Sequence, residues 1–152
     1  MKGILQKQFE MNHRAIHTNV AGLTHAESVR RPEPGGNSLN WVVGHVVATR
    51  AGILRLLKAE AVWDDGTAAP YKRGSQGDPE APLSLERLLQ DLDRSQRLIM
   101  GALEALPEEA LAERGRKDLV GVELGFASFH ESYHAGQTGL HRRLLGHAGA
   151  IP

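Results

Sequence analysis

Two histidines in the C-terminal part of the chain are spaced so that both could bind one metal ion. His130 and His134 lie four residues apart within residues 129–137, which read Phe-His-Glu-Ser-Tyr-His-Ala-Gly-Gln. On an α-helix, residues at this spacing lie about 40° apart around the axis and roughly 6 Å apart along it, so both imidazoles can reach the same ion. The spacing therefore predicts two ligands of a metal site.

The same residues also match His-Glu-x-x-His, the pattern of zinc proteases. The extended form of that pattern requires glycine at position 137 and histidine at position 140, whereas this chain has Gln137 and Leu140. Glu131 would point about 100° away from His130 around the helix, which favours a carboxylate that supports a ligand or lies at the surface over a general base. Because no strand is predicted that could bind a substrate backbone, a protease is the less favoured alternative.

The composition limits the class of protein. The 152 residues suffice for one hydrophobic core, and we predict a single domain over residues 1–152. There are no cysteines, which excludes disulfides and thiolate ligands, fits the cytoplasm, and means that any thiol chemistry needs an external sulfur. The 18 Lys plus Arg balance 18 Asp plus Glu, so no nucleic-acid or membrane partner is expected. Neither a signal peptide nor a membrane span is predicted.

The spacing of apolar residues predicts four helices and no strand. They cover about residues 2–23, from Asn37 or Ser38 to about Ala59, from a cap at Ser84 to about Leu106, and about 120–145 with a stop at Gly146. Residues 60–82 are rich in glycine and proline and predict a long loop. We therefore predict an all-α four-helix bundle, with a long crossover that leaves the second and third helices parallel.

The last predicted helix has two adjacent faces of different character. An apolar face carries Val122, Phe126, Phe129, Tyr133, Gly136 and Leu140, and a largely polar face carries Glu123, Ala127, His130, His134, Gln137 and His141. A polar line beside the apolar face of a buried helix is costly unless its groups have partners. Its presence indicates a filled site.

A third ligand would have to come from another helix, and His45 is the best candidate. It lies near the middle of the second helix, whose apolar residues cover more than half of its circumference. Three neutral imidazoles leave a divalent ion with its full charge and an open position, which is typical of catalytic sites. His13 and His17 form another pair at the same spacing, but each lies one position off the apolar face, which favours a half-exposed pair.

Two segments of the chain resemble the DinB-like/YfiT-like family of metal-dependent enzymes. They are residues 35–45, Gly-Gly-Asn-Ser-Leu-Asn-Trp-Val-Val-Gly-His, and residues 130–137, His-Glu-Ser-Tyr-His-Ala-Gly-Gln. The resemblance extends over most of the chain and is weakest in residues 60–82. It implies a four-helix bundle whose divalent metal is held by His45, His130 and His134, and it implies no role for the histidines His13, His17, His25, His141 and His147.

The same resemblance implies that a low-molecular-weight thiol, such as bacillithiol or mycothiol, is transferred to an electrophilic small molecule or serves an isomerase reaction. The chemistry is reasonable because a dication with neutral ligands lowers the pKa of a bound thiol. The alternatives are a hydrolase with a metal-activated water and a non-catalytic, stress-response bundle that binds a metal or small ligand. The sequence does not distinguish among Zn, Ni, Cu, Fe and Mn. It also leaves the oligomeric state open, although the resemblance implies that a homodimer is possible.

Overall fold

The structure, a computed structural model, describes residues 1–33, 35–75 and 82–151, which contain six α-helices and two short 3-10 helices joined by turns and loops. Four helices are long: α1 (Lys2–Val20), α3 (Leu39–Leu56), α5 (Leu85–Ala105) and α6 (Val120–Leu144). The short elements are α2 (His25–Ser28), α4 (Asp65–Ala68), η1 (Ala69–Tyr71) and η2 (Glu108–Ala112). The described residues contain no strand, so the predicted all-α class is confirmed. The expectation of only four helices is incomplete, because the connections contain short helices.

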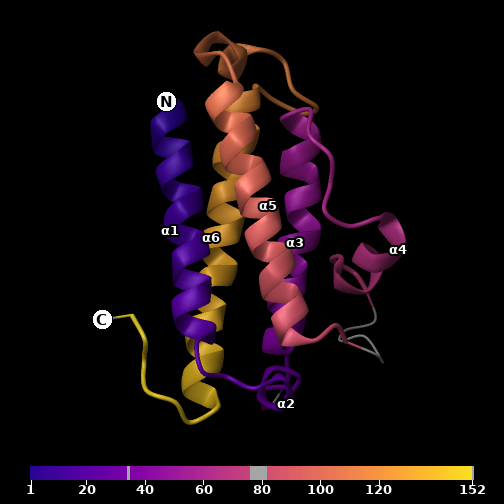
Figure 1. The fold of residues 1–152 in the computed structure, drawn as a ribbon, viewed down its shortest axis with the longest axis vertical. Coiled ribbons are helices and arrows are strands. Elements are labelled where there is room, and N and C mark those ends of the chain that lie inside the picture. The colour runs from indigo at the N-terminus through magenta and orange to yellow at the C-terminus, as the bar shows by residue number, and fades with distance from the viewer. Residues whose placement is uncertain (34, 76–81, 152) are drawn as a thin grey trace.

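The helices α3 and α5 run in the same direction, and α1 and α6 run opposite to them (Figure 1). Side-chain amides of α1 reflect this arrangement: Asn12 donates to the carbonyl oxygen of Ser128 over 3.0 Å, and Asn19, two turns later, donates to that of Ala135 over 3.3 Å. The two contacts advance together along α1 and α6, so these helices are parallel. Both α5 and α6 pack against α1 and against α3. The chain between α3 and α5 therefore returns along the length of the long helices, as the predicted crossover requires.

Most helix boundaries lie where the capping residues predict them. Ser38 accepts a hydrogen bond from the backbone N–H of Trp41, and Ser84 accepts one from that of Arg87, so each satisfies an amide of a first helical turn. Gly146 follows α6 with a φ of 90°, a conformation that favours glycine. The first helix is shorter than predicted and ends at Val20.

The apolar face predicted for the last helix is exposed, which corrects that part of the sequence interpretation. Phe126, Phe129 and Tyr133 are 68%, 67% and 59% exposed. The face of α6 that enters the core instead includes Leu124, Ser128, Glu131, Ala135 and Thr138. The prediction assumed that apolar side chains mark the buried face, but here polar groups of α1 and α3 pair with those of α6 and make burial of a polar face favourable.

A buried ion pair between Arg50 of α3 and Glu131 of α6 is the centre of this polar layer. Arg50 is fully buried, and two of its nitrogens donate to the Glu131 carboxylate over 2.9 and 2.5 Å. Its remaining N–H groups are satisfied by three acceptors of α5: the carbonyl oxygen of Leu92, Ser95 Oγ and Gln96 Oε1. Glu131 is therefore a core residue engaged with Arg50, and the surface position considered for it is wrong.

The long helices do not have the character of membrane spans. In the described residues, no helix combines the length and the apolar composition needed to cross a bilayer.

Candidate metal centre

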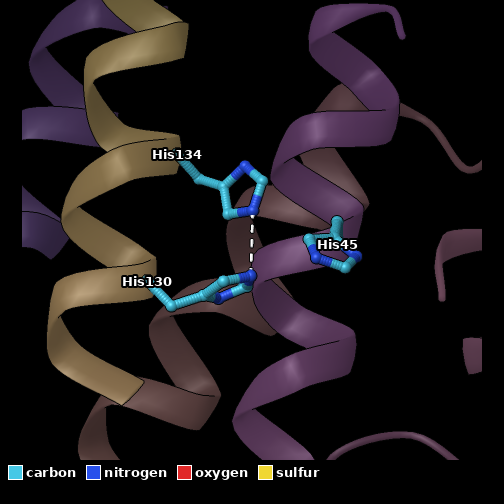
Figure 2. A group of neighbouring side chains, drawn as sticks. All are labelled: His45, His130 and His134. Atoms are coloured by element: carbon cyan, nitrogen blue, oxygen red, sulfur yellow. Dashed lines mark hydrogen bonds between the residues drawn. The ribbon is translucent and has the colours of Figure 1, made fainter. Parts of the chain in front are cut away.

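His45 of α3 and the pair His130 and His134 of α6 point toward one another between the two helices (Figure 2). One nitrogen of each imidazole lies within 4.8 Å of those of the other two. The Nε2 atoms of His130 and His134 are 3.2 Å apart. Zinc bonds of about 2.0–2.1 Å in a tetrahedral site would place two ligand nitrogens roughly 3.3 Å apart, so this pair already has suitable spacing. The structure thus brings all three predicted residues together.

Hydrogen bonds to Nδ1 of His45 and His134 determine which nitrogen of each ring can bind a metal ion. His45 Nδ1 lies 2.6 Å from the carbonyl oxygen of Tyr71, and because a carbonyl only accepts, Nδ1 carries the proton. His134 Nδ1 donates in the same way to Gln137 Oε1 over 2.8 Å. In both residues Nε2 keeps its lone pair, and metal-binding histidines commonly have this kind of outer partner.

A glycine and an aromatic ring hold His45 in place. A Cβ atom at Gly44 would clash with the ring of Tyr71, so glycine allows η1 to approach α3 closely enough for the Tyr71 carbonyl to meet His45. The ring of Trp41, one turn earlier, stacks on that of His45 with centroids 4.6 Å apart, and Trp41 Nε1 donates to the carbonyl oxygen of Pro70 over 3.1 Å. The loop between α3 and α5 is therefore part of the site.

Sequence reasoning placed Gln137 on the polar face with His134 but assigned it no role, although a polar residue three positions later lies on the same helix face. It missed Tyr71, which contributes a main-chain oxygen from a segment without periodicity, and a carbonyl leaves no mark in the sequence.

Burial keeps the three imidazoles neutral. It is the main cause that lowers the pKa of His134 to about 4, where the nearby His45 and His130 rings act in the same direction and the Gln137 hydrogen bond opposes them. Burial likewise lowers the pKa values of His45 and His130. His45 and His134 are 4% and 6% exposed. At neutral pH each of the three rings is therefore uncharged and keeps one unprotonated nitrogen, which can bind a metal ion.

A second group of residues with metal-ligand chemistry lies between α1 and α5. His13 Nε2 and His17 Nε2 are 3.2 and 2.7 Å from the same oxygen, Oδ1 of Asp93. Both histidines are half-buried, which confirms the half-exposed pair predicted from their positions beside the apolar face. Burial lowers the pKa of His13 to about 4, and the positive charge of Arg50 adds to this effect. The carboxylate partner was not anticipated, because it comes from a helix distant in the sequence.

Two cavities border the three-histidine cluster and are lined by different residues. One of about 330 Å³ is lined by His45 and His130, together with residues of α3, α6 and the segment after η1. Another of about 450 Å³ is lined by His134 and Gln137, with Trp41 and residues before α3. The cluster therefore borders two cavities, each with the volume of a small-molecule site.

Comparison with known proteins identifies the family. The family model of the DinB superfamily matches residues 8–138, and the chain belongs to this superfamily, as the resemblance of residues 35–45 and 130–137 predicts. A crystal structure described as the conserved protein of locus from Enterococcus faecalis is similar to this one, with a TM-score of 0.75. The two chains are 19% identical over 95% of this chain and 96% of that one, which shows a shared fold. The comparison with curated proteins gives no match.

Proposed function

We propose that the chain is a divalent-metal-dependent enzyme in which a four-helix bundle of α1, α3, α5 and α6 holds the ion through His45, His130 and His134. The observation that carries the proposal is the convergence of three neutral imidazoles, two of which have a proton on Nδ1 and a lone pair on Nε2. Three neutral ligands leave the full charge of the ion and at least one coordination position for a substrate.

The reaction that we propose is transfer of a low-molecular-weight thiol, such as bacillithiol or mycothiol, to an electrophilic small molecule. Two cavities that each border the cluster suit two co-substrates, whereas hydrolysis requires space for only one organic molecule. The bound ion would lower the pKa of the thiol, so that its proton leaves to solvent. The sulfur then forms a bond to the electrophilic carbon, and the leaving group departs with the electron pair of the bond that breaks. The chain itself has no cysteine to supply this sulfur.

Metal content tests the centre independently of the reaction. We expect the purified protein to hold a stoichiometric divalent ion, measured by inductively coupled plasma mass spectrometry, and His45→Ala to lose it. His25→Ala is the matched control, because His25 is an exposed histidine outside the cluster. A wild-type protein without a divalent ion, or a His45→Ala variant that retains it, would show that the three histidines are not the metal centre.

Thiol dependence tests the reaction. The metal-loaded protein is incubated with monochlorobimane and, in parallel, with bacillithiol, mycothiol, glutathione or no thiol, and the conjugate is followed by fluorescence. We expect conjugation above the uncatalysed rate with at least one thiol, and its loss in His45→Ala. Turnover of electrophilic substrates that is equally fast without any thiol would favour the hydrolase and exclude the transferase.

A further inference from the structure

A groove between α3 and α6 leads from the histidine cluster toward the start of α6. Its near part is the cavity of about 330 Å³ beside His45 and His130, and its far part has a volume of about 410 Å³ and is lined by Arg116 and Lys117. The two parts adjoin because they share four wall residues: Thr49, Ile53, Phe126 and Ala127. The groove is therefore continuous from the cluster to the first turn of α6.

The walls of this groove favour an apolar ligand. Ile53 and Phe126 face both parts of it, and Leu56 and Val122 extend the apolar lining toward the far end. Phe126 is 68% exposed, so a ligand body that covers its ring removes apolar surface from water.

The near end of the groove carries a positive charge with no ion-pair partner among the described residues. Lys72 and Arg73 both line it, but Lys72 is paired with Asp65 over 2.7 Å. Arg73 is exposed and lines the same cavity as His45 and His130. The planar guanidinium of an arginine in this position can donate two parallel hydrogen bonds to one acidic group.

The charges at the far end balance one another and do not add an anion site. Arg116 and Lys117 are accompanied by Asp118 and Glu123. Glu123 Oε1 accepts from the backbone N–H groups of Lys117 and Asp118 over 2.8 and 3.2 Å, and Asp118 Oδ1 accepts from that of Leu119 over 2.7 Å. The unbalanced charge of the groove therefore lies beside the cluster.

From this arrangement we propose that the groove binds an organic acid with an apolar body, whose acidic group pairs with Arg73 while the body lies along Ile53 and Phe126. This proposal rests on the proposed function, because the metal centre would position the reacting end of such a substrate. The binding itself needs only residues of the chain, so it can be tested without metal and without turnover.

The experiment uses the metal-free full-length protein with 4-phenylbutyrate and its uncharged analogue 4-phenylbutyramide, and measures dissociation constants by calorimetry. We expect the acid to bind about tenfold more tightly than the amide, and Arg73→Met to remove this difference by weakening only the acid. Phe126→Ala should weaken both ligands, each by about fivefold, because it removes the shared apolar contact.

Arg97→Met is the matched control, since Arg97 is an exposed arginine of α5 outside the groove. It should leave the affinity for both ligands unchanged. The proposal is overturned if the acid does not bind, if acid and amide bind equally, or if Arg97→Met weakens the acid as much as Arg73→Met does. Each result is independent of the thiol assay, so failure of this proposal and failure of the proposed reaction are distinguishable.

Discussion

Two histidine pairs with the same four-residue spacing occur in this chain, and their third neighbours differ. The pair of α6, His130 and His134, faces a further imidazole, that of His45. The pair of α1 faces the carboxylate of Asp93 on α5. The spacing is shared, so the difference between the two sites comes from the residue that a separate helix brings to each pair.

That third residue decides where the protons lie. An ionised carboxylate only accepts hydrogen bonds, so the Nε2 atom of His17 carries a proton and donates to Asp93 over 2.7 Å. The Nε2 atom of His13 lies 3.2 Å from the same carboxylate oxygen. In the α6 pair, the Nε2 atom of His134 faces another nitrogen while its Nδ1 donates to Gln137. In the α6 pair His134 thus presents a lone pair toward the cluster, whereas in the α1 pair His17 presents a proton to Asp93, which is why we propose the metal for the α6 pair.

The buried ion pair of Arg50 and Glu131 connects the two sites electrostatically. The positive charge of Arg50 disfavours protonation of His13, and the negative charge of Glu131 favours protonation of His130. In both rings burial is the larger influence and lowers the pKa. The ion pair therefore acts on the pKa of one histidine at each site, in opposite directions, although neither Arg50 nor Glu131 is one of the clustered residues.

Glu131→Gln should have the largest effect, because it leaves the Arg50 charge buried without its partner. Loss of one member of a buried pair typically costs about 3–5 kcal/mol, and we expect this decrease in the free energy of unfolding, measured by urea denaturation with and without divalent metal. The exposed control Glu60→Gln should change it by less than about 0.5 kcal/mol. A large loss seen only with metal present would mean that Glu131 supports the ion instead of the fold.

The contrast between the two sites also shows what sequence reasoning can find. His45 is predictable because it lies on a mostly buried helix, at the same depth as the histidine pair of another helix. The helices and the caps at Ser38, Ser84 and Gly146 follow from local physics that acts within a few residues. Membership of the DinB superfamily follows from the same two segments that hold the three histidines.

The parts that were missed depend on partners from distant segments. In the sequence Arg50 interrupts an apolar helix, and only the fold shows that acceptors from α5 and α6 surround it. The pattern places Phe126 and Phe129 in the core, since hydrophobicity alone cannot reveal that the opposite, polar face finds matched partners. Periodicity describes one helix at a time, whereas polar matching is a property of pairs of helices.

A direct comparison of the two pairs comes from His130→Ala and His17→Ala. Removing a ligand should lower the affinity for Zn²⁺ by more than about 100-fold, beyond the typical effect of losing an outer partner, and removing a histidine of the α1 pair should leave it unchanged. Competition with a chromophoric chelator measures both constants. If His17→Ala releases an ion from the protein, the α1 pair with Asp93 is a metal site as well, and the distinction drawn from proton positions is wrong.

Gln137→Leu tests the outer partner that distinguishes His134 from the histidines of the α1 pair. Without the acceptor, the Nδ1 proton of His134 loses its hydrogen bond and the ring is less well oriented. We expect metal affinity to fall by about 10–100-fold in the same competition assay. Gln137→Glu keeps an acceptor oxygen and should retain the affinity, so equal losses in the two variants would assign the effect to packing.

The smallest effect that we predict concerns His13 and pH. Its pKa is lowered to about 4 in the folded protein, mainly by burial and then by Arg50, against an ordinary value of 6.5. As pH falls below about 6.5, His13 takes up a proton in the unfolded chain but not in the folded protein. The free energy of unfolding therefore keeps its full value above that pH and decreases as pH falls toward 4. The ring is partly exposed, and we expect a share on the order of 1 kcal/mol between pH 7 and pH 5. Urea denaturation of the metal-free wild type and of His13→Gln at both pH values measures this difference. The wild type should lose more stability than the variant between pH 7 and pH 5. Equal losses would show that His13 is not held neutral by its burial beside Arg50.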